Sequence, residues 1–363
     1  MYEINLRITG PTPLAPQVLQ AMSQQIISHR SDEFKSLYAG VDRNLRALLG
    51  TIHPVIFLTS SGTGGLEATV QNILRPCDRV LSLQTGFYGE LFAQITERTL
   101  DAPEQLIRLR SEPGQSTDTQ KLSYMLQQQH FDAVLITHNE SSTGVLNPLK
   151  HLVQIIKANS GALVLCDAVS SAGVVPIHMD QWGIDVLITV PQKGLMAPPG
   201  LAIVVANDRA QKRASSARVG MYFDFKRALA CARLCQTPST PSIVSFRGLQ
   251  VSLQLLFSEG LERVYSRHSQ ARAICQSALT ELGLDSLAKP PFQSPAMTAI
   301  NLPAHIHSQP LQLALEQYYK LYTAQGAGDL QDRVLRIAHM GWFSLTDIKW
   351  AMVCLKDHMR KTY

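Results

Sequence analysis

The sequence predicts an α/β fold, with a mostly parallel central sheet in a large domain and a smaller α+β domain after it. Short apolar runs rich in β-branched residues alternate with longer stretches of helical periodicity, which is the pattern of a parallel sheet covered by helices. This alternation ends near residue 245. With 363 residues, 45% of them hydrophobic, the chain has enough apolar material for the cores of two domains.

Six short runs are predicted to be strands of the central sheet. Apolar and β-branched residues dominate them, as in strands buried on both faces, and Gly, Pro, Asp or Asn residues bound them. The runs cover residues 55–59, 78–83, 133–137, 162–166, 185–189 and 201–205. Helices are predicted between them over 65–74 and 149–157, where apolar residues recur at helical spacing.

The pattern after residue 245 predicts long helices and a few further strands. The helices are expected over 243–266, 268–282 and 345–359, and the strands over 297–301 and 333–338, after a turn-rich segment at 288–295. We therefore divide the chain into an N-terminal arm (1–15), a large domain (16–245) and a small domain (246–363).

Composition and charge argue against several classes of protein. The formal net charge is only +5, and basic residues alternate with acidic ones, so no nucleic-acid surface is expected. No stretch approaches the roughly 20 apolar residues of a membrane helix. The first residues also lack the basic start and apolar segment of a signal peptide, so we expect a cytoplasmic protein without a membrane partner.

The 6 cysteines do not predict a disulfide framework or a metal site. Cys231 and Cys235 could offer two thiolates one helical turn apart, but no second pair accompanies them. Buried or half-buried thiols are the better interpretation, and we expect no metal.

The loop after the first predicted strand is a candidate phosphate site. Ser61, Gly62 and Thr63 form a turn of small residues that opens a helix. Backbone N–H groups and hydroxyls at the positive end of a helix can hold a phosphate. A plain helix cap is the alternative for this segment taken alone.

Three further strand ends carry groups with distinctive chemistry. Tyr88 lies in a glycine-flanked loop, where its ring could stack on a flat ligand or simply pack in the core. Asp167 ends a very apolar strand, where a carboxylate needs a cation or firm hydrogen-bond donors. Lys193 follows the next strand, and desolvation there would favour the neutral amine that attacks carbonyls, although a salt-bridged lysine is the alternative.

Together these groups match the needs of pyridoxal 5'-phosphate. Its phosphate, ring face, ring nitrogen and aldehyde each require a separate partner. Because the carboxyl ends of parallel strands meet at one edge of the sheet, the four groups are expected to converge there.

At this level of detail the chain resembles the class V aminotransferases of fold type I, in particular the group of alanine, serine and aspartate aminotransferases that use glyoxylate or pyruvate. The resemblance runs through almost the whole chain, over the segments 8–13 (ITGPTP), 29–34 (HRSDEF), 59–68 (TSSGTGGLEA), 137–148 (THNESSTGVLNP), 167–171 (DAVSS), 179–185 (MDQWGID), 192–200 (QKGLMAPPG) and 336–341 (RIAHMG).

The resemblance implies roles for individual residues. Lys193 would form the Schiff base with the cofactor and move the substrate proton, and Asp167 would keep the pyridine nitrogen protonated. Val169 and Tyr88 would pack on opposite faces of the ring. The other implied cofactor contacts are Ser61, Gly62, Thr63 and Gln192 at the phosphate and Ser142 at the ring hydroxyl.

The resemblance also implies a shared active site in a homodimer. The segment 236–241 resembles one that reaches the neighbouring subunit's phosphate, with Thr237 as the first candidate and Thr240 as the second. Arg336 matches the arginine that clamps the substrate α-carboxylate with two donors, and the backbone at Gly10 would contribute to the same pocket.

The implied reaction is transamination from a small α-amino acid, of the alanine, serine or aspartate class, to glyoxylate or pyruvate. A carbon–sulfur lyase or cysteine desulfurase on the same fold is the alternative, but the nearest late cysteine, Cys354, falls in the predicted final helix instead of a loop. A non-catalytic relative would be expected only without Lys193 or Asp167. Pro191 stands where the family usually has a serine, and the loop 322–329 matches no family segment closely.

Overall fold

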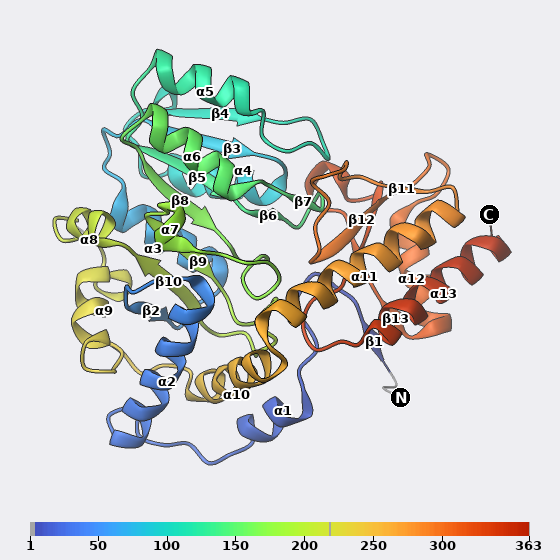
Figure 1. The fold of residues 1–363 in the computed structure, drawn as a ribbon, viewed down its shortest axis with the longest axis horizontal. Coiled ribbons are helices and arrows are strands. Elements are labelled where there is room, and N and C mark those ends of the chain that lie inside the picture. Colours follow the sequence, from blue (N-terminus) through green and yellow to red (C-terminus); the bar gives the residue numbers. More distant parts are fainter. Residues whose placement is uncertain (1–3, 218, 363) are drawn as a thin grey trace.

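A seven-stranded sheet forms the centre of the larger of two lobes (Figure 1). The computed structural model describes residues 4–217 and 219–362. Across the sheet the strands run in the order β2 (Val55–Leu58), β10 (Ala202–Ala206), β9 (Val186–Thr189), β8 (Leu163–Asp167), β5 (Ala133–Thr137), β3 (Val80–Gln84) and β4 (Leu106–Arg110). Only β10 is antiparallel to its neighbours, which confirms the predicted, mostly parallel sheet.

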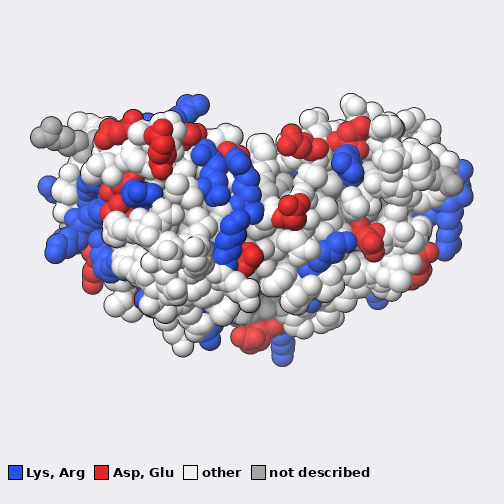
Figure 2. Space-filling model, turned by 90° about the horizontal axis from the view of Figure 1, so that it is seen from above, with Lys and Arg blue, Asp and Glu red and all other residues white. Residues whose placement is uncertain are grey.

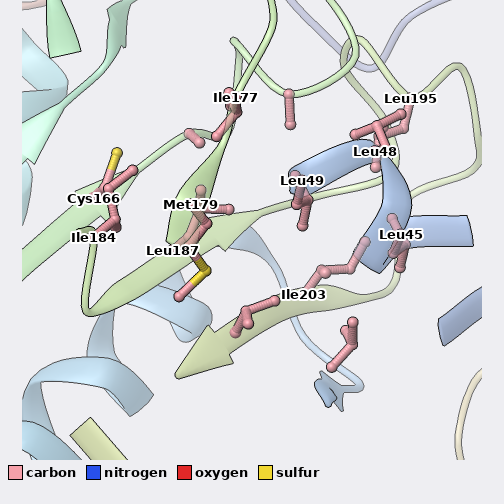
Figure 3. Close-up of a cluster of buried hydrophobic side chains, with 14 of the residues drawn as sticks. Leu45, Leu48, Leu49, Cys166, Ile177, Met179, Ile184, Leu187, Leu195 and Ile203 are labelled. Carbon is pink, nitrogen blue, oxygen red and sulfur yellow. The ribbon is translucent and has the colours of Figure 1, made fainter. Parts of the chain in front are cut away.

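Helices cover both faces of this sheet, and each face has its own hydrophobic cluster. One cluster is formed with α3 (Gly62–Ile73), α4 (Phe87–Glu97), α8 (Asp208–Ala214) and α9 (Phe225–Ala232). The opposite cluster is formed with α2 (Asp32–Leu49), α5 (Thr119–Gln128), α6 (Leu149–Asn159), α7 (Met179–Trp182) and α10 (Ile243–Glu259). Figure 3 shows part of the second cluster, where Leu45 and Leu49 of α2 lie over Leu187 and Ile203 of the sheet.

The smaller lobe is built on a four-stranded antiparallel sheet. Its order is β11 (Asp285–Ser286), β12 (Met297–Asn301), β15 (Val334–Ala338) and β14 (Ala324–Gln325). Apolar side chains of α11 (Leu261–Glu281), α12 (Ser308–Tyr319) and α13 (Leu345–Thr362) pack on it in a third cluster. The predicted α+β lobe is therefore present.

One helix prediction is wrong, because the helix expected over 243–266 is two helices. Gly260 separates α10 from α11 with a φ of 88°, a conformation that favours glycine. Leu249 and Leu253 of α10 belong to the cluster of the large lobe, so the predicted domain boundary after residue 245 falls within a helix that packs there. The division into domains stays a prediction.

The N-terminal arm runs between the two lobes and touches both. Its strand β1 (Asn5–Leu6) pairs with β13 (Leu321–Tyr322) of the small lobe. Farther along, the Thr12 amide donates to the carbonyl of Gln192 in the large lobe (3.1 Å). Helix α1 (Pro16–Met22) then packs against α10.

The surface view agrees with the composition. Figure 2 shows basic and acidic side chains interspersed over both lobes, with a notch between them. Among the residues that the structure describes, no helix combines the length and apolar character needed to cross a membrane.

Candidate active site

The candidate site lies at the carboxyl edge of the large sheet, which faces the small lobe. The hairpin of β6 (Asn139–Glu140) and β7 (Val145–Leu146) follows β5 at this edge. The Leu146 amide of this hairpin donates to the Phe292 carbonyl of the small lobe (2.7 Å), and the Gly144 carbonyl accepts from the Ser294 amide (2.8 Å). Residues from both lobes can therefore meet at this edge (Figure 1).

Lys193 lies in the loop after β9, and the N-terminal arm fixes its position. The Thr12 hydroxyl donates to the Lys193 carbonyl (3.1 Å), and the Lys193 Nζ donates to the carbonyl of Thr9. Burial and the nearby Arg336 guanidinium lower the pKa of Lys193 to about 8, while Asp167 opposes this shift. The amine is consequently closer to its neutral, nucleophilic form than a surface lysine is.

Asp167 ends β8 and is almost fully buried. Its carboxylate Oδ1 accepts a hydrogen bond from the Val169 amide (2.8 Å). Burial raises the pKa of Asp167 to about 7, with a further increase from the charge of Glu140, against the opposing effects of Val169 and Lys193. This carboxyl group is suited to share a proton with a basic ring nitrogen.

Arg336 reaches the same site from β15 of the small lobe. Its Nε donates to the Gln325 carbonyl (2.6 Å) and its Nη1 to the Ser141 carbonyl (2.9 Å), so carbonyls of both lobes hold the guanidinium. Burial lowers its pKa, and Tyr88 and Glu140 counteract that effect. The loop that matched no family segment closely thus supplies Gln325, which orients the arginine.

The turn at Ser61 begins helix α3 and packs directly on the Asp167 segment. Ser61 is the N-cap and accepts a long hydrogen bond from the Gly64 amide (3.4 Å). A β carbon at Gly62 would lie 3.3 Å from Val169 Cγ2, so this turn borders the predicted ring-packing residue. The first amides of a helix have no intrahelical partner, so with the exposed Thr63 they are suited to bind an anion, and the phosphate site stays a prediction.

Tyr88 lies in the first turn of α4, and Ser142 lies beside that turn. The Ser142 hydroxyl accepts from the Phe87 amide (2.9 Å) and donates to Glu140 Oε1 (2.7 Å). This hydroxyl is therefore already occupied within the protein, and its implied contact with the cofactor stays a prediction. The predictions from the sequence assigned no role to Glu140, because it lies among polar residues (137–143, THNESST) and lacks the apolar run that singled out Asp167.

The remaining predicted cofactor contacts are Gln192, Thr237 and Thr240. Gln192 has a buried Oε1 for which the described residues offer no hydrogen-bond partner. Thr237 is buried and donates to the Ser239 carbonyl (2.8 Å), whereas Thr240 is exposed. Their roles at the phosphate stay predictions.

These residues fit pyridoxal phosphate. The donors at the start of α3 suit its phosphate, the buried Asp167 suits its ring nitrogen, and the amine of Lys193 suits its aldehyde. Among the described residues no cluster of His, Cys, Asp or Glu is suited to bind a metal ion.

Comparison with known proteins identifies the family. The family model described as aminotransferase class V matches residues 4–345. A Synechococcus protein named soluble hydrogenase, small subunit, is 32% identical over 97% of this chain and 91% of its own. Alanine–glyoxylate aminotransferase of rat is 32% identical over 93% of this chain and 83% of its own.

A solved structure supports the same assignment. The crystal structure of alanine–glyoxylate aminotransferase from Nostoc sp. superposes with a TM-score of 0.92 at 25% identity, over 98% of this chain and 95% of that one. The chain therefore belongs to the class V aminotransferases, which are pyridoxal phosphate-dependent transaminases.

Proposed function

We propose that this enzyme transfers the amino group of a small α-amino acid, of the alanine, serine or aspartate class, to glyoxylate or pyruvate. The observation that carries the proposal is the position of Lys193, whose amine lies close enough to both Asp167 and Arg336 for their charges to alter its pKa. The amine that would react, the carboxylate that would pair with the ring nitrogen and the arginine that would bind the substrate carboxylate thus share one site. The names of the rat and Nostoc relatives support glyoxylate as the acceptor.

Each part of the cofactor has a proposed partner. The start of α3 with Ser61, Gly62 and Thr63 would hold the phosphate, joined by Gln192, while Tyr88 and Val169 would enclose the ring. Ser142 would approach the ring hydroxyl, and Asp167 would pair with the ring nitrogen. Pyridoxal phosphate, when bound, supplies the aldehyde for a Schiff base and the electron sink that makes the substrate α-proton acidic.

The protein's own groups perform the binding and the proton transfer. Arg336 presents a rigid, planar guanidinium that binds the α-carboxylate, and the backbone at Gly10 borders the same pocket. This contact orients the α-carbon toward Lys193, whose Nζ, with a pKa of about 8, can accept and return a proton near neutral pH. Asp167 would pair with the ring nitrogen and favour its protonated form.

We further propose that two copies complete each site. Thr240 is exposed on the segment predicted to reach a neighbouring subunit, and Met221, Tyr222 and Leu234 are large exposed apolar residues near it in sequence. Such residues favour burial against another protein surface. If Thr237 acts across the interface, mixing inactive Lys193→Ala and Thr237→Ala dimers should restore activity, because one hybrid site would be intact. No recovery, with sedimentation showing exchanged dimers, would contradict the sharing.

The lyase or desulfurase alternative is not favoured. Cys354 is buried in α13 within the third hydrophobic cluster, and burial raises the pKa of its thiol to about 11. A sulfur-transferring enzyme needs an accessible, readily ionised thiol near its substrate. Cys354 has neither property.

A panel of substrates tests the proposed reaction. Alanine, serine and aspartate should each be combined with glyoxylate, pyruvate and 2-oxoglutarate, and the keto-acid product measured. We expect turnover with at least one of the three donors and glyoxylate or pyruvate, and none in Lys193→Ala, which should also lose the borohydride-trapped cofactor. Sulfide release from cysteine without any transamination would overturn the proposal.

A further inference from the structure

A fully buried carboxylate, Glu140, joins the parts of the site, and neither the sequence prediction nor the family comparison assigns it a role. Its Oε2 accepts from the amides of Tyr88 and Gly89 (both 3.0 Å), and its Oε1 accepts from the amide (3.0 Å) and hydroxyl (2.7 Å) of Ser142. None of the ion pairs found among the described residues includes it. The chain thus buries a carboxylate that only polar donors satisfy.

Burial raises the pKa of Glu140, and the hydrogen bonds from Ser142, Gly89 and Tyr88 counteract this shift by stabilising the ionised form. All of its hydrogen-bond partners use N–H or O–H groups as donors, and Ser142 Oγ already accepts from the Phe87 amide. Helix α4 adds the positive end of its dipole, which stabilises an anion at this place.

The contact is built so closely that residue 86 has to be glycine. A β carbon on Gly86 would lie 2.3 Å from Ser142 Oγ and 2.6 Å from Glu140 Cγ. Such distances are far inside van der Waals contact, so a larger residue would push the β6 segment away from α4. Residue 86 thus has no side chain at the point where Glu140 approaches α4.

Glu140 also lies where its charge acts on the groups of the reaction. It raises the pKa of Asp167 and counteracts the burial of Arg336. The charged or titratable groups facing this region are Asp167 on β8, Lys193 after β9, Tyr88 on α4 and Arg336 on β15. The carbonyl next to Glu140, that of Ser141, accepts from Arg336 and so links the same segment to the small lobe.

We propose that Glu140 is a positioning residue for the transamination site, whose carboxylate holds the start of α4 with Tyr88, offsets the positive charge of Arg336 and opposes the ionisation of Asp167. The inference rests on the proposed function. It assigns one side chain the task of fixing the stacking ring and the Ser142 hydroxyl. Glu140 itself need not touch the substrate.

Glu140→Gln tests both parts of this role, because the amide group keeps the shape of the side chain but removes its charge. The amide NH2 would also face the N–H and O–H donors that now bind the carboxylate. In the cofactor-free protein, hydrogen exchange at the amides of Tyr88 and Gly89 should become about tenfold faster or more. Cofactor affinity should decrease as the pH is lowered and Asp167 becomes protonated. The pH at which the affinity reaches half of its maximum should fall by about one unit in the variant, because Asp167 loses a neighbouring negative charge. The exposed Glu104→Gln should change neither quantity.

Two more variants separate the hydrogen bonds from the charge. Ser142→Ala removes one donor to Glu140 and the acceptor of the Phe87 amide, so hydrogen exchange at Phe87 should accelerate although the carboxylate of Glu140 is still present. If Glu140→Gln does not fold, Glu140→Asp keeps the charge but shortens the reach. It should then expose the Tyr88 and Gly89 amides without moving the pH dependence.

The outcomes distinguish this inference from the proposed function. Unchanged hydrogen exchange at the Tyr88 and Gly89 amides in Glu140→Gln would overturn the role of Glu140, provided that the wild-type enzyme transaminates. If only Glu140→Asp folds, the same result in that variant would overturn it. An unchanged pH dependence in a folded Glu140→Gln would also overturn the proposed effect of its charge on Asp167. A wild type inactive with every donor and acceptor pair would instead overturn the proposed function, whatever the exchange data show.

Discussion

Gly10 lies against the side chain of Lys193, so that a β carbon on residue 10 would be 2.8 Å from the Lys193 Nζ. Gly10 also has a φ of 115°, which side-chain-bearing residues rarely adopt. The arm thus approaches the reacting amine with bare backbone, and the Thr9 carbonyl beside it accepts from the same Nζ. This relationship explains why a segment far away in sequence belongs to the site.

Gly10→Ala should therefore impair the reaction more than the fold. The added methyl group and the strained backbone would displace the Lys193 amine, and a misplacement of about 1 Å can lower a rate about a hundredfold. The measurement is the rate of the first half-reaction with a saturating amino donor. Gly161→Ala is the matched control, because a β carbon there meets no atom within 4 Å. Equal rates in the two variants would contradict the proposed contact.

The pKa of Lys193 predicts the pH dependence of cofactor capture. Only the neutral amine attacks an aldehyde, and burial together with Arg336 lowers the pKa of this amine to about 8. The rate at which the cofactor-free protein forms its Schiff base should therefore rise with pH up to about 8 and then level off. Stopped-flow absorbance measures this rate. A rise that continues to pH 10 would mean that Lys193 titrates as an ordinary exposed lysine.

The central strands could be predicted because both faces of each are buried. Strands such as β5 and β8 contain almost only apolar residues, and the predicted limits are identical to the observed ones for β5 and differ by one residue for β8. The edge strand β4 was not predicted. It has only one neighbour, and its polar residues Arg108 and Arg110 bond to Glu97 and Glu90 of α4. A strand with charged side chains lacks the pattern that marked the others.

The candidate site was predictable where the chemistry belongs to a side chain type. Asp167 and Lys193 are charged groups at the ends of apolar strands, and the structure brings them together. The groups that position them act through main-chain atoms or across the lobes. Examples are the carbonyls of Thr9 and Gln325, which bond to Lys193 and Arg336. Every residue has such a carbonyl, so no sequence pattern indicates which ones contribute.

Ion pairs of the buried Asp185 with two partly exposed basic residues should stabilise the large lobe. Asp185 is paired with Lys157 (2.6 Å) and Arg209 (3.2 Å), and its side chain is 1% exposed. Asp185→Ala would leave the partly buried Lys157 without its anion, and breaking such a pair lowers the free energy of unfolding by about 3–5 kcal/mol. Chemical denaturation measures it. The exposed Glu281, which pairs with Lys356, provides the control, since Glu281→Ala removes a solvated carboxylate and should change stability far less. Similar losses in both variants would contradict this account.

Arg336→Lys should separate carboxylate recognition from the rest of the chemistry. Lysine keeps the positive charge but loses the planar guanidinium that bonds to Gln325 and Ser141 and that can bind a carboxylate with two donors. We expect kcat/KM for alanine to fall by about a hundredfold, which corresponds to about 2.7 kcal/mol of transition-state stabilisation. The control is an amine donor without a carboxylate, such as ethylamine, whose slow reaction should be unaffected. Equal losses for alanine and ethylamine would show that Arg336 supports the fold of the site instead of binding the carboxylate, and unchanged kinetics would place the carboxylate elsewhere.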